Sequence, residues 1–201
     1  MPRYLDRVDD LIPIAEGRDG YFTVAEAGRL GITTAVLAHL ERAGHIEREA
    51  PAVYRLARWP APGHPGLWAA LLWAESKGSA AFSHRTALAI HGISDINPAK
   101  IELTFLDRMP RIRGTVPPTL LLRAREMRAA DVTQIDGLPV TRLKRTLVDL
   151  IVDDIALDAV EDVLAHHRGQ LSEEDLKAIT ALRDLPRDLR NYIVHASKDN
   201  G

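Results

Sequence analysis

Apolar residues recur at helical spacing along the start of the chain and predict three short helices. The first, over residues 6–16, has an apolar face made of Leu5, Val8, Leu11, Ile12 and Ala15. Thr23 and Glu26 have the spacing of a capping box, which starts a second helix that ends near Gly31. The third helix ends at Gly44 and has an apolar stripe of Ile32, Val36, Leu37 and Leu40.

The pattern then changes from helical spacing to alternation. Residues 45–49 and 53–56 read as two short strands, and Ala50-Pro51-Ala52 forms the turn between them. Three helices followed by a hairpin predict a winged helix-turn-helix domain over residues 1–60. In such domains the third helix enters the major groove of DNA. The predicted DNA-binding residues are Thr33, Thr34, Ala35, His39, Arg42, Arg48 and Arg55.

The net charge of the winged-helix domain leaves open a function other than DNA binding. Residues 1–60 hold eight Lys and Arg against nine Asp and Glu, and the wing carries Glu47 and Glu49. A polyanion is repelled by such acids, so the domain could instead be a protein-interaction module that does not bind DNA.

Proline and glycine interrupt the periodicity at residues 61–66, which predicts a linker before a C-terminal domain over residues 67–201. Helices are expected at 67–75, with Trp68 and Trp73 as core anchors, and at 83–92. Short strands are expected at 101–105, 120–123, 132–135 and 138–140, and helices from Thr141 onward, with Ser172 as a cap. The predicted fold class is therefore α+β: a winged helix followed by a mixed α/β domain with a small sheet and several helices.

A basic band lies in this second domain. Residues 108–145 contain nine cations against three acids, whereas residues 146–201 contain six cations against twelve acids. The band is a candidate face for RNA, nucleotide phosphates, DNA or an acidic partner, unless it packs against the acidic helices in surface ion pairs. Its residues are Arg108, Arg111, Arg113, Arg123, Arg125, Arg128, Arg142, Lys144 and Arg145.

Candidate chemistry adds little to this picture. No nucleotide-binding loop, hydrolase elbow, kinase motif or metal-ligand spacing occurs, so we expect no catalytic residue, metal or cofactor. Ser83 and His84 are interpreted as a helix cap and a surface side chain, because neighbouring helical residues point in different directions. The chain has no cysteine, signal peptide or apolar run of membrane length, which predicts a cytoplasmic protein with no membrane contact.

Three segments together resemble the AbiEi family, the antitoxins of type IV toxin-antitoxin pairs. They are the winged helix ending in Gly44–Arg48 and Val53–Leu56, the helix from Ser83-His84 to His91-Gly92, and Leu143-Lys144-Arg145-Thr146-Leu147-Val148-Asp149. The resemblance implies a regulator that binds its own promoter and counters a nucleotidyltransferase-like toxin without a stable complex between the two proteins. The basic band would then serve antitoxicity. An antitoxin that promotes phosphorylation of the toxin is the alternative.

Overall fold

The structure is a computed structural model that describes residues 4–61, 63–64, 66–106, 108–123, 125–183 and 185–195. For residues 4–6, 191, 192, 194 and 195 it describes the backbone alone. Two compact units make up the chain. Unit 1 comprises the residues up to Ala80 together with Pro110–Pro117, and unit 2 comprises Ala81–Met109 together with the residues from Pro118 onward.

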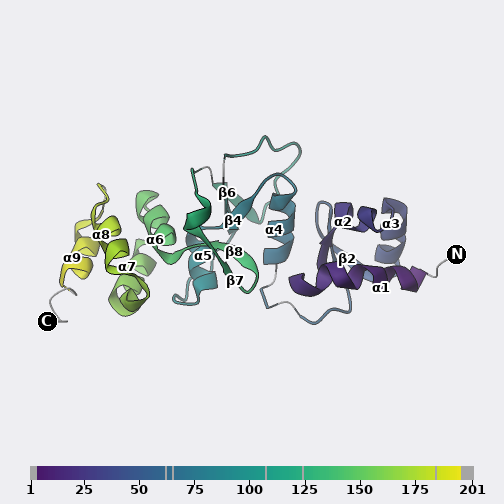
Figure 1. Ribbon diagram of the computed structural model, residues 1–201, viewed down its shortest axis with the longest axis horizontal. Helices are drawn as coiled ribbons and strands as arrows, with labels where there is room; N and C mark the ends of the chain where they lie inside the picture. The colour runs from purple at the N-terminus through teal and green to yellow at the C-terminus, as the bar shows by residue number, and fades with distance from the viewer. Residues whose placement is uncertain are drawn as a thin grey trace. The chain divides into compact units, whose positions relative to one another are not determined.

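Unit 1 contains the predicted winged helix (Figure 1). Its elements are α1 (Tyr4–Ala15), β1 (Tyr21–Thr23), α2 (Val24–Arg29), α3 (Thr34–Arg42), β2 (Ile46–Ala50), β3 (Val53–Leu56) and α4 (Leu67–Glu75). The strands form an antiparallel sheet in the order β1-β3-β2. The capping box at Thr23 and Glu26 is confirmed. The helix α3 ends at Arg42 with Ala43 as its cap, just before the expected stop at Gly44, which takes a φ of +73°.

Apolar burial holds the helices of unit 1 on one another and on the sheet. Leu11 of α1 and Leu37 and Leu40 of α3 are at most 1% exposed, and they share a core cluster with Phe22 and Ile46. Leu5, which was expected on the apolar face of α1, has a side chain outside the described residues. Burial of this stripe is what orients α3 and leaves its opposite side exposed.

The helix α4 belongs to a different unit from the one expected. The sequence assigned residues 67–75 to the C-terminal domain, whereas α4 contacts β1, β2 and β3 and clusters with unit 1. Trp68 and Trp73 are buried, as expected of core anchors. The linker predicted over 61–66 includes residues 62 and 65, which lie outside the described residues.

Unit 2 is a five-stranded sheet with helices, in the strand order β6-β5-β4-β8-β7 (Figure 1). The strands are β4 (Ala80–Phe82), β5 (Ile101–Phe105), β6 (Leu120–Arg123), β7 (Val132–Ile135) and β8 (Leu138–Thr141). The helices are α5 (His84–His91), α6 (Leu143–Val152), α7 (Leu157–His166), α8 (Glu173–Thr180) and α9 (Arg187–His195). The α+β class expected from the sequence is confirmed.

The core of unit 2 lies where α5 packs on α6 and α6 packs on α7 and α8. Leu88, Leu147, Val160 and Ile179 are fully buried there. The turn between α6 and α7 uses left-handed residues at Asp154 and Ala156, and the Ser172 cap of α8 is confirmed as a capping box. None of the helices among the described residues is long and apolar enough to cross a bilayer.

Candidate functional site

The exposed side of α3 is the candidate DNA-reading surface in unit 1. Thr33 caps the helix, because its hydroxyl oxygen accepts a hydrogen bond from the Val36 amide at 3.4 Å. Thr34, Ala35 and Arg42 are exposed, and His39 is half-buried. Since the buried stripe of α3 faces the core, these residues lie on the outer face, as a recognition helix requires.

The wing adds one exposed cation and two exposed acids. Arg48 on β2 is exposed, and its guanidinium carbon lies 6.0 Å from the ring centre of Tyr54. Glu47 and Glu49 flank it and are also exposed. The Val24 amide donates a 2.9 Å hydrogen bond to the carbonyl of Ala52, which ties the tip of the wing to the start of α2.

Arg55 was predicted to contact phosphate, and the structure contradicts this. Its side chain is buried, and its Nε donates to the carbonyl of Asp19 at 3.1 Å. One terminal nitrogen, Nη2, donates to the carbonyls of both Trp59 and Pro60, and the guanidinium lies over the Tyr21 ring. Arg55 therefore fastens the end of the hairpin to neighbouring backbone and is not available to DNA.

The reason for this error is that β3 has no solvent-facing side. It is the central strand of its sheet, it contacts α1 and α4, and all four of its residues are buried. Among the described residues of the winged helix, Arg29 at the end of α2 and Arg58 after β3 are also exposed, although neither was predicted to bind DNA. The position of Arg29 on the helix that precedes the recognition helix is the signal that could have identified it.

His84 in unit 2 is buried, although it was expected on the surface. Its side chain is 0% exposed, with Nδ1 2.9 Å from the Ser83 hydroxyl and Nε2 3.1 Å from a carboxylate oxygen of Asp153. Because the Asp153 carboxylate can only accept, Nε2 carries the ring proton and donates to it. Nδ1 then accepts from the Ser83 hydroxyl, which itself accepts from the Thr104 hydroxyl at 2.8 Å. Burial lowers the pKa of His84 to about 4, which keeps the imidazole neutral at pH 7.

This arrangement of hydroxyl, imidazole and carboxylate resembles a catalytic relay, but it lacks access. Ser83 is itself 0% exposed, so no substrate reaches its oxygen. Ser83 occupies the cap position of α5, as predicted, yet its side chain caps no amide because it is bonded to His84 and Thr104. Together with Thr104 these three groups form a polar link between β5, α5 and the end of α6.

Two carboxylates at this link, Glu102 and Asp153, hold arginines, among them Arg123 and Arg125 of the predicted basic band. Glu102 is fully buried and accepts hydrogen bonds from the amide and guanidinium of Arg85, at 2.8 and 2.7 Å, and from Arg123 at 3.2 Å. Burial alone would raise the pKa of Glu102, but these hydrogen bonds outweigh it and hold the pKa below its usual value. Asp153 accepts from Arg123 and Arg125.

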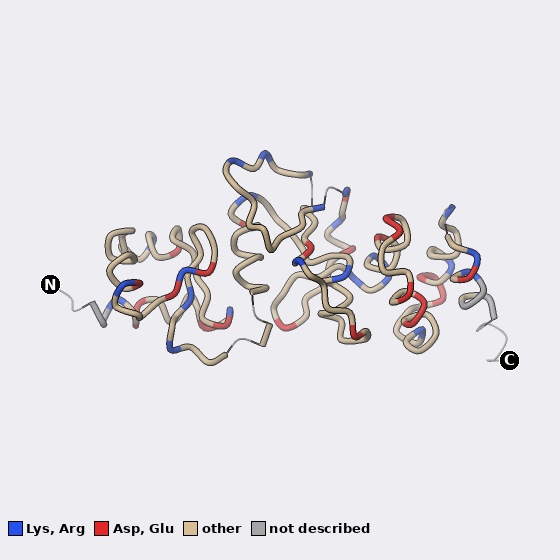
Figure 2. Tube along the Cα trace, turned by 180° about the vertical axis from the view of Figure 1, so that it is seen from behind, with Lys and Arg blue, Asp and Glu red and all other residues tan. Residues whose placement is uncertain are grey.

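The predicted basic band is therefore not one free face. Arg145 donates to Asp149 at 2.8 Å and to Asp131 at 3.1 Å, and Lys144 lies 3.4 Å from Asp175. Lys and Arg in unit 2 are interspersed with Asp and Glu along the chain (Figure 2). The exposed members of the band are divided between the units, with Arg111 and Arg113 in unit 1 and Arg108, Arg128 and Arg142 in unit 2.

Comparison with known families agrees with this division of the chain. Residues 79–191 match the family model described as the AbiEi antitoxin C-terminal domain. Residues 9–57 match a second model, described as a transcriptional regulator and AbiEi antitoxin. No curated protein gives a significant sequence match.

A solved structure has a similar fold. It is the crystal structure of the Rv2827c protein from Mycobacterium tuberculosis, which is 13% identical and superposes with a TM-score of 0.62. The alignment covers all of this chain and 78% of the other. At this identity the likeness supports the fold alone.

Proposed function

Because the chain belongs to the AbiEi antitoxin family, we propose that it is the antitoxin of a toxin-antitoxin pair and that its winged helix binds the pair's promoter. The observation that carries the DNA-binding part is the exposed face of α3, with Thr34, Ala35 and Arg42 opposite a buried stripe. The proposed contact set is the predicted one without Arg55, and it gains Arg29 and Arg58.

A gel-shift titration with the DNA upstream of the gene tests the promoter part. Arg42→Ala and Arg48→Ala each remove one exposed cation, so each should weaken binding and reduce the slope of log affinity against log salt by about 1. Arg187→Ala removes an equal charge from an exposed position on α9 and is the matched control. A wild-type protein that shifts no promoter fragment at low salt would favour the protein-interaction alternative.

We further propose that the partner toxin is a nucleotidyltransferase-like enzyme encoded beside this chain. Coexpression of the two proteins should restore the growth that the toxin alone arrests. Arg42→Ala should keep this protection while weakening promoter binding, because α3 lies outside the region that matches the antitoxin domain. Loss of protection in a folded Arg42→Ala protein would contradict the separation of the two roles.

The burial of Ser83 and His84 supports a structural role for both residues, and we propose that neutralisation of the toxin does not use them as catalysts. Their burial separates them from any protein substrate. The phosphorylation alternative is tested by incubating the purified chain with toxin and ATP and measuring the toxin's mass. A gain of one phosphoryl group that needs this chain would overturn the proposal.

A further inference from the structure

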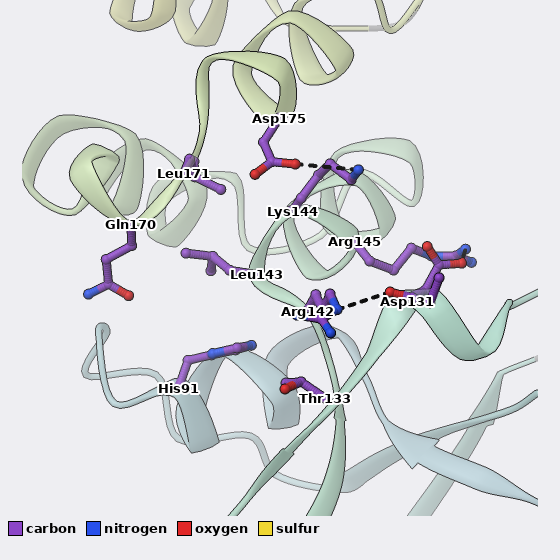
Figure 3. A pocket seen from close by; sticks show the side chains of 11 residues that line it. His91, Asp131, Thr133, Arg142, Leu143, Lys144, Arg145, Gln170, Leu171 and Asp175 are labelled. Atoms are coloured by element: carbon purple, nitrogen blue, oxygen red, sulfur yellow. Dashed lines mark hydrogen bonds and ion pairs between the residues drawn. The ribbon is translucent and has the colours of Figure 1, made fainter.

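A pocket of about 310 Å³ lies in unit 2, and its lining contains none of the residues of the polar link around His84. It is lined by residues of four segments: the end of α5, β7 with the turn before it, the start of α6, and the turn leading into α8 (Figure 3). Small-molecule sites usually measure about 300–1,000 Å³, so this pocket is large enough for a compact ligand.

Arg142 supplies an uncompensated positive charge at this pocket. Its Nε donates to the carbonyl of Ala130 at 3.0 Å, and no carboxylate among the described residues pairs with it. A guanidinium has five N–H donors, so the remaining ones are free to bind an anion in a forked geometry. Lys144, which lies at 3.4 Å from Asp175 with 42% of its side chain exposed, adds a second cation.

The two carboxylates that line the pocket are already satisfied by donors of the protein. Asp131 accepts from Arg145 at 3.1 Å and from the Arg128 amide at 3.0 Å. Asp175 accepts from the amide and hydroxyl of Ser172, at 3.1 and 2.8 Å. Asp175 also pairs with Lys144, and Asp131 with Arg145, so Arg142 is the cation of the lining that no carboxylate among the described residues offsets. The pocket lining therefore keeps a net positive charge for a ligand to neutralise.

Neutral hydrogen-bonding groups complete the lining. The hydroxyl of Thr133 and the side-chain amide of Gln170 have no protein partner within the part of the chain that the structure describes. Nε2 of His91 lies 2.8 Å from the carbonyl of Thr141 and donates to it, which leaves Nδ1 as the second polar atom of the ring for a ligand. The ring points toward Arg142 (Figure 3).

We propose that this pocket binds a phosphate monoester of mononucleotide size. Arg142 and Lys144 bind the phosphate, because forked and ammonium donors both suit its oxygens. The pocket exceeds the size of a bare phosphate, and Thr133, Gln170 and His91 offer both donors and acceptors to a sugar or a base. This binding goes beyond promoter recognition and does not depend on it, since every lining residue belongs to unit 2.

Titration of the intact, ¹⁵N-labelled chain tests the proposal at constant ionic strength. The probes are adenosine 5′-monophosphate, guanosine 5′-monophosphate, sodium phosphate, unphosphorylated adenosine and a short single-stranded RNA. We expect saturable amide shifts with at least one monophosphate below about 5 mM, centred on His91, Thr133 and Lys144. Phosphate alone should bind more weakly, and adenosine should not bind.

Substitutions distinguish binding in this pocket from a general attraction of phosphates to exposed cations of the protein. Arg142→Gln should weaken the monophosphate about tenfold and Thr133→Val about threefold, with unchanged circular dichroism. Arg128→Gln removes an exposed cation outside the pocket lining and should leave the affinity unchanged. The proposal is overturned if neither monophosphate saturates, if adenosine or phosphate alone binds as tightly, if only the RNA binds, or if both pocket variants bind like the wild type.

Discussion

The carboxylate of Glu102 is charged although it is fully buried, because Arg85 and Arg123 surround it with donors. Removing one member of such a buried group leaves the others without a partner, which costs about 3 kcal/mol. We expect Glu102→Gln to lower the free energy of unfolding in urea by about this amount. Glu47→Gln, on the exposed wing, is the control and should change it by less than about 0.5 kcal/mol. Equal effects of the two substitutions would show that the cluster contributes no net stability.

His84 makes stability depend on pH. The ordinary histidine pKa is 6.5 and burial lowers that of His84 to about 4, against the opposing effect of Asp149. The unfolded chain therefore takes up a proton near pH 6.5 and the folded chain only near pH 4, so stability is complete above pH 6.5 and is lost as the pH falls toward 4. Between pH 6.5 and 5 the loss should be about 2 kcal/mol.

Urea unfolding at several pH values measures this slope. His84→Gln should flatten it between pH 6.5 and 5, whatever its effect on stability at neutral pH. His166→Gln changes an exposed side chain on α7 and should leave the slope as it is. A wild-type slope that survives in His84→Gln would assign the pH dependence to other groups.

Residue type alone does not distinguish arginines that are buried and stabilise the fold from arginines that are exposed and free to bind a partner. Arg42 and Arg55 were both predicted to contact DNA, yet one is exposed and the other is enclosed by β1, Trp59 and Pro60. His84 was misassigned for a related reason. It begins α5 with a φ of +52°, and its ring is buried between Ser83 and Asp153 instead of lying on the helix surface. Such differences depend on tertiary neighbours, which local spacing does not contain.

At the scale of elements, periodicity predicted the helices well and the shortest strands poorly. The apolar stripes of α3, α6 and α8 bury Leu37, Leu147 and Ile179, so local pattern and packing agree. β1 and β4 were not predicted, because three residues are too few to show alternation and each strand exists through its pairing, as between Phe82 and Val140. In α4 nearly every residue is buried, so its sequence has no polar face from which to infer its neighbours.

The turn between α1 and β1 depends on the absence of a side chain at Gly20. Its φ is +85°, and an added Cβ would lie 2.6 Å from Cγ of Trp59. We expect Gly20→Ala to lower the melting temperature and to cost more than about 1 kcal/mol, since strain and overlap act together. Gly28→Ala in α2 is the matched control, because an added Cβ there meets nothing within 4 Å. It should stabilise by about 0.5 to 1 kcal/mol, and a Gly20→Ala protein as stable as Gly28→Ala would contradict the close approach.

At the scale of the whole molecule, the net charge of −2 must be reconciled with a proposed polyanion partner. The proposed contact set has four exposed cations, Arg29, Arg42, Arg48 and Arg58, so it can make few contacts with phosphates. Acidic side chains close to these cations would therefore weaken DNA binding noticeably. The exposed acids that flank Arg48 on β2 are Glu47 and Glu49. Repulsion between exposed charges is modest and is screened beyond about 10 Å at 0.1 M salt.

Neutralising the wing should therefore strengthen promoter binding in a salt-dependent way. The double variant Glu47→Gln, Glu49→Gln should raise affinity about two- to fivefold at low salt, and the gain should shrink as salt screens the charges. Glu173→Gln with Glu174→Gln on α8 makes the same change of net charge at exposed positions of unit 2. If the wing lies against DNA, only the substitutions at Glu47 and Glu49 should raise the affinity, because repulsion depends on the distance between a carboxylate and the phosphates. Equal gains from both pairs would show that net charge governs the affinity, and no gain from either would place the wing away from DNA and favour its use as a protein contact.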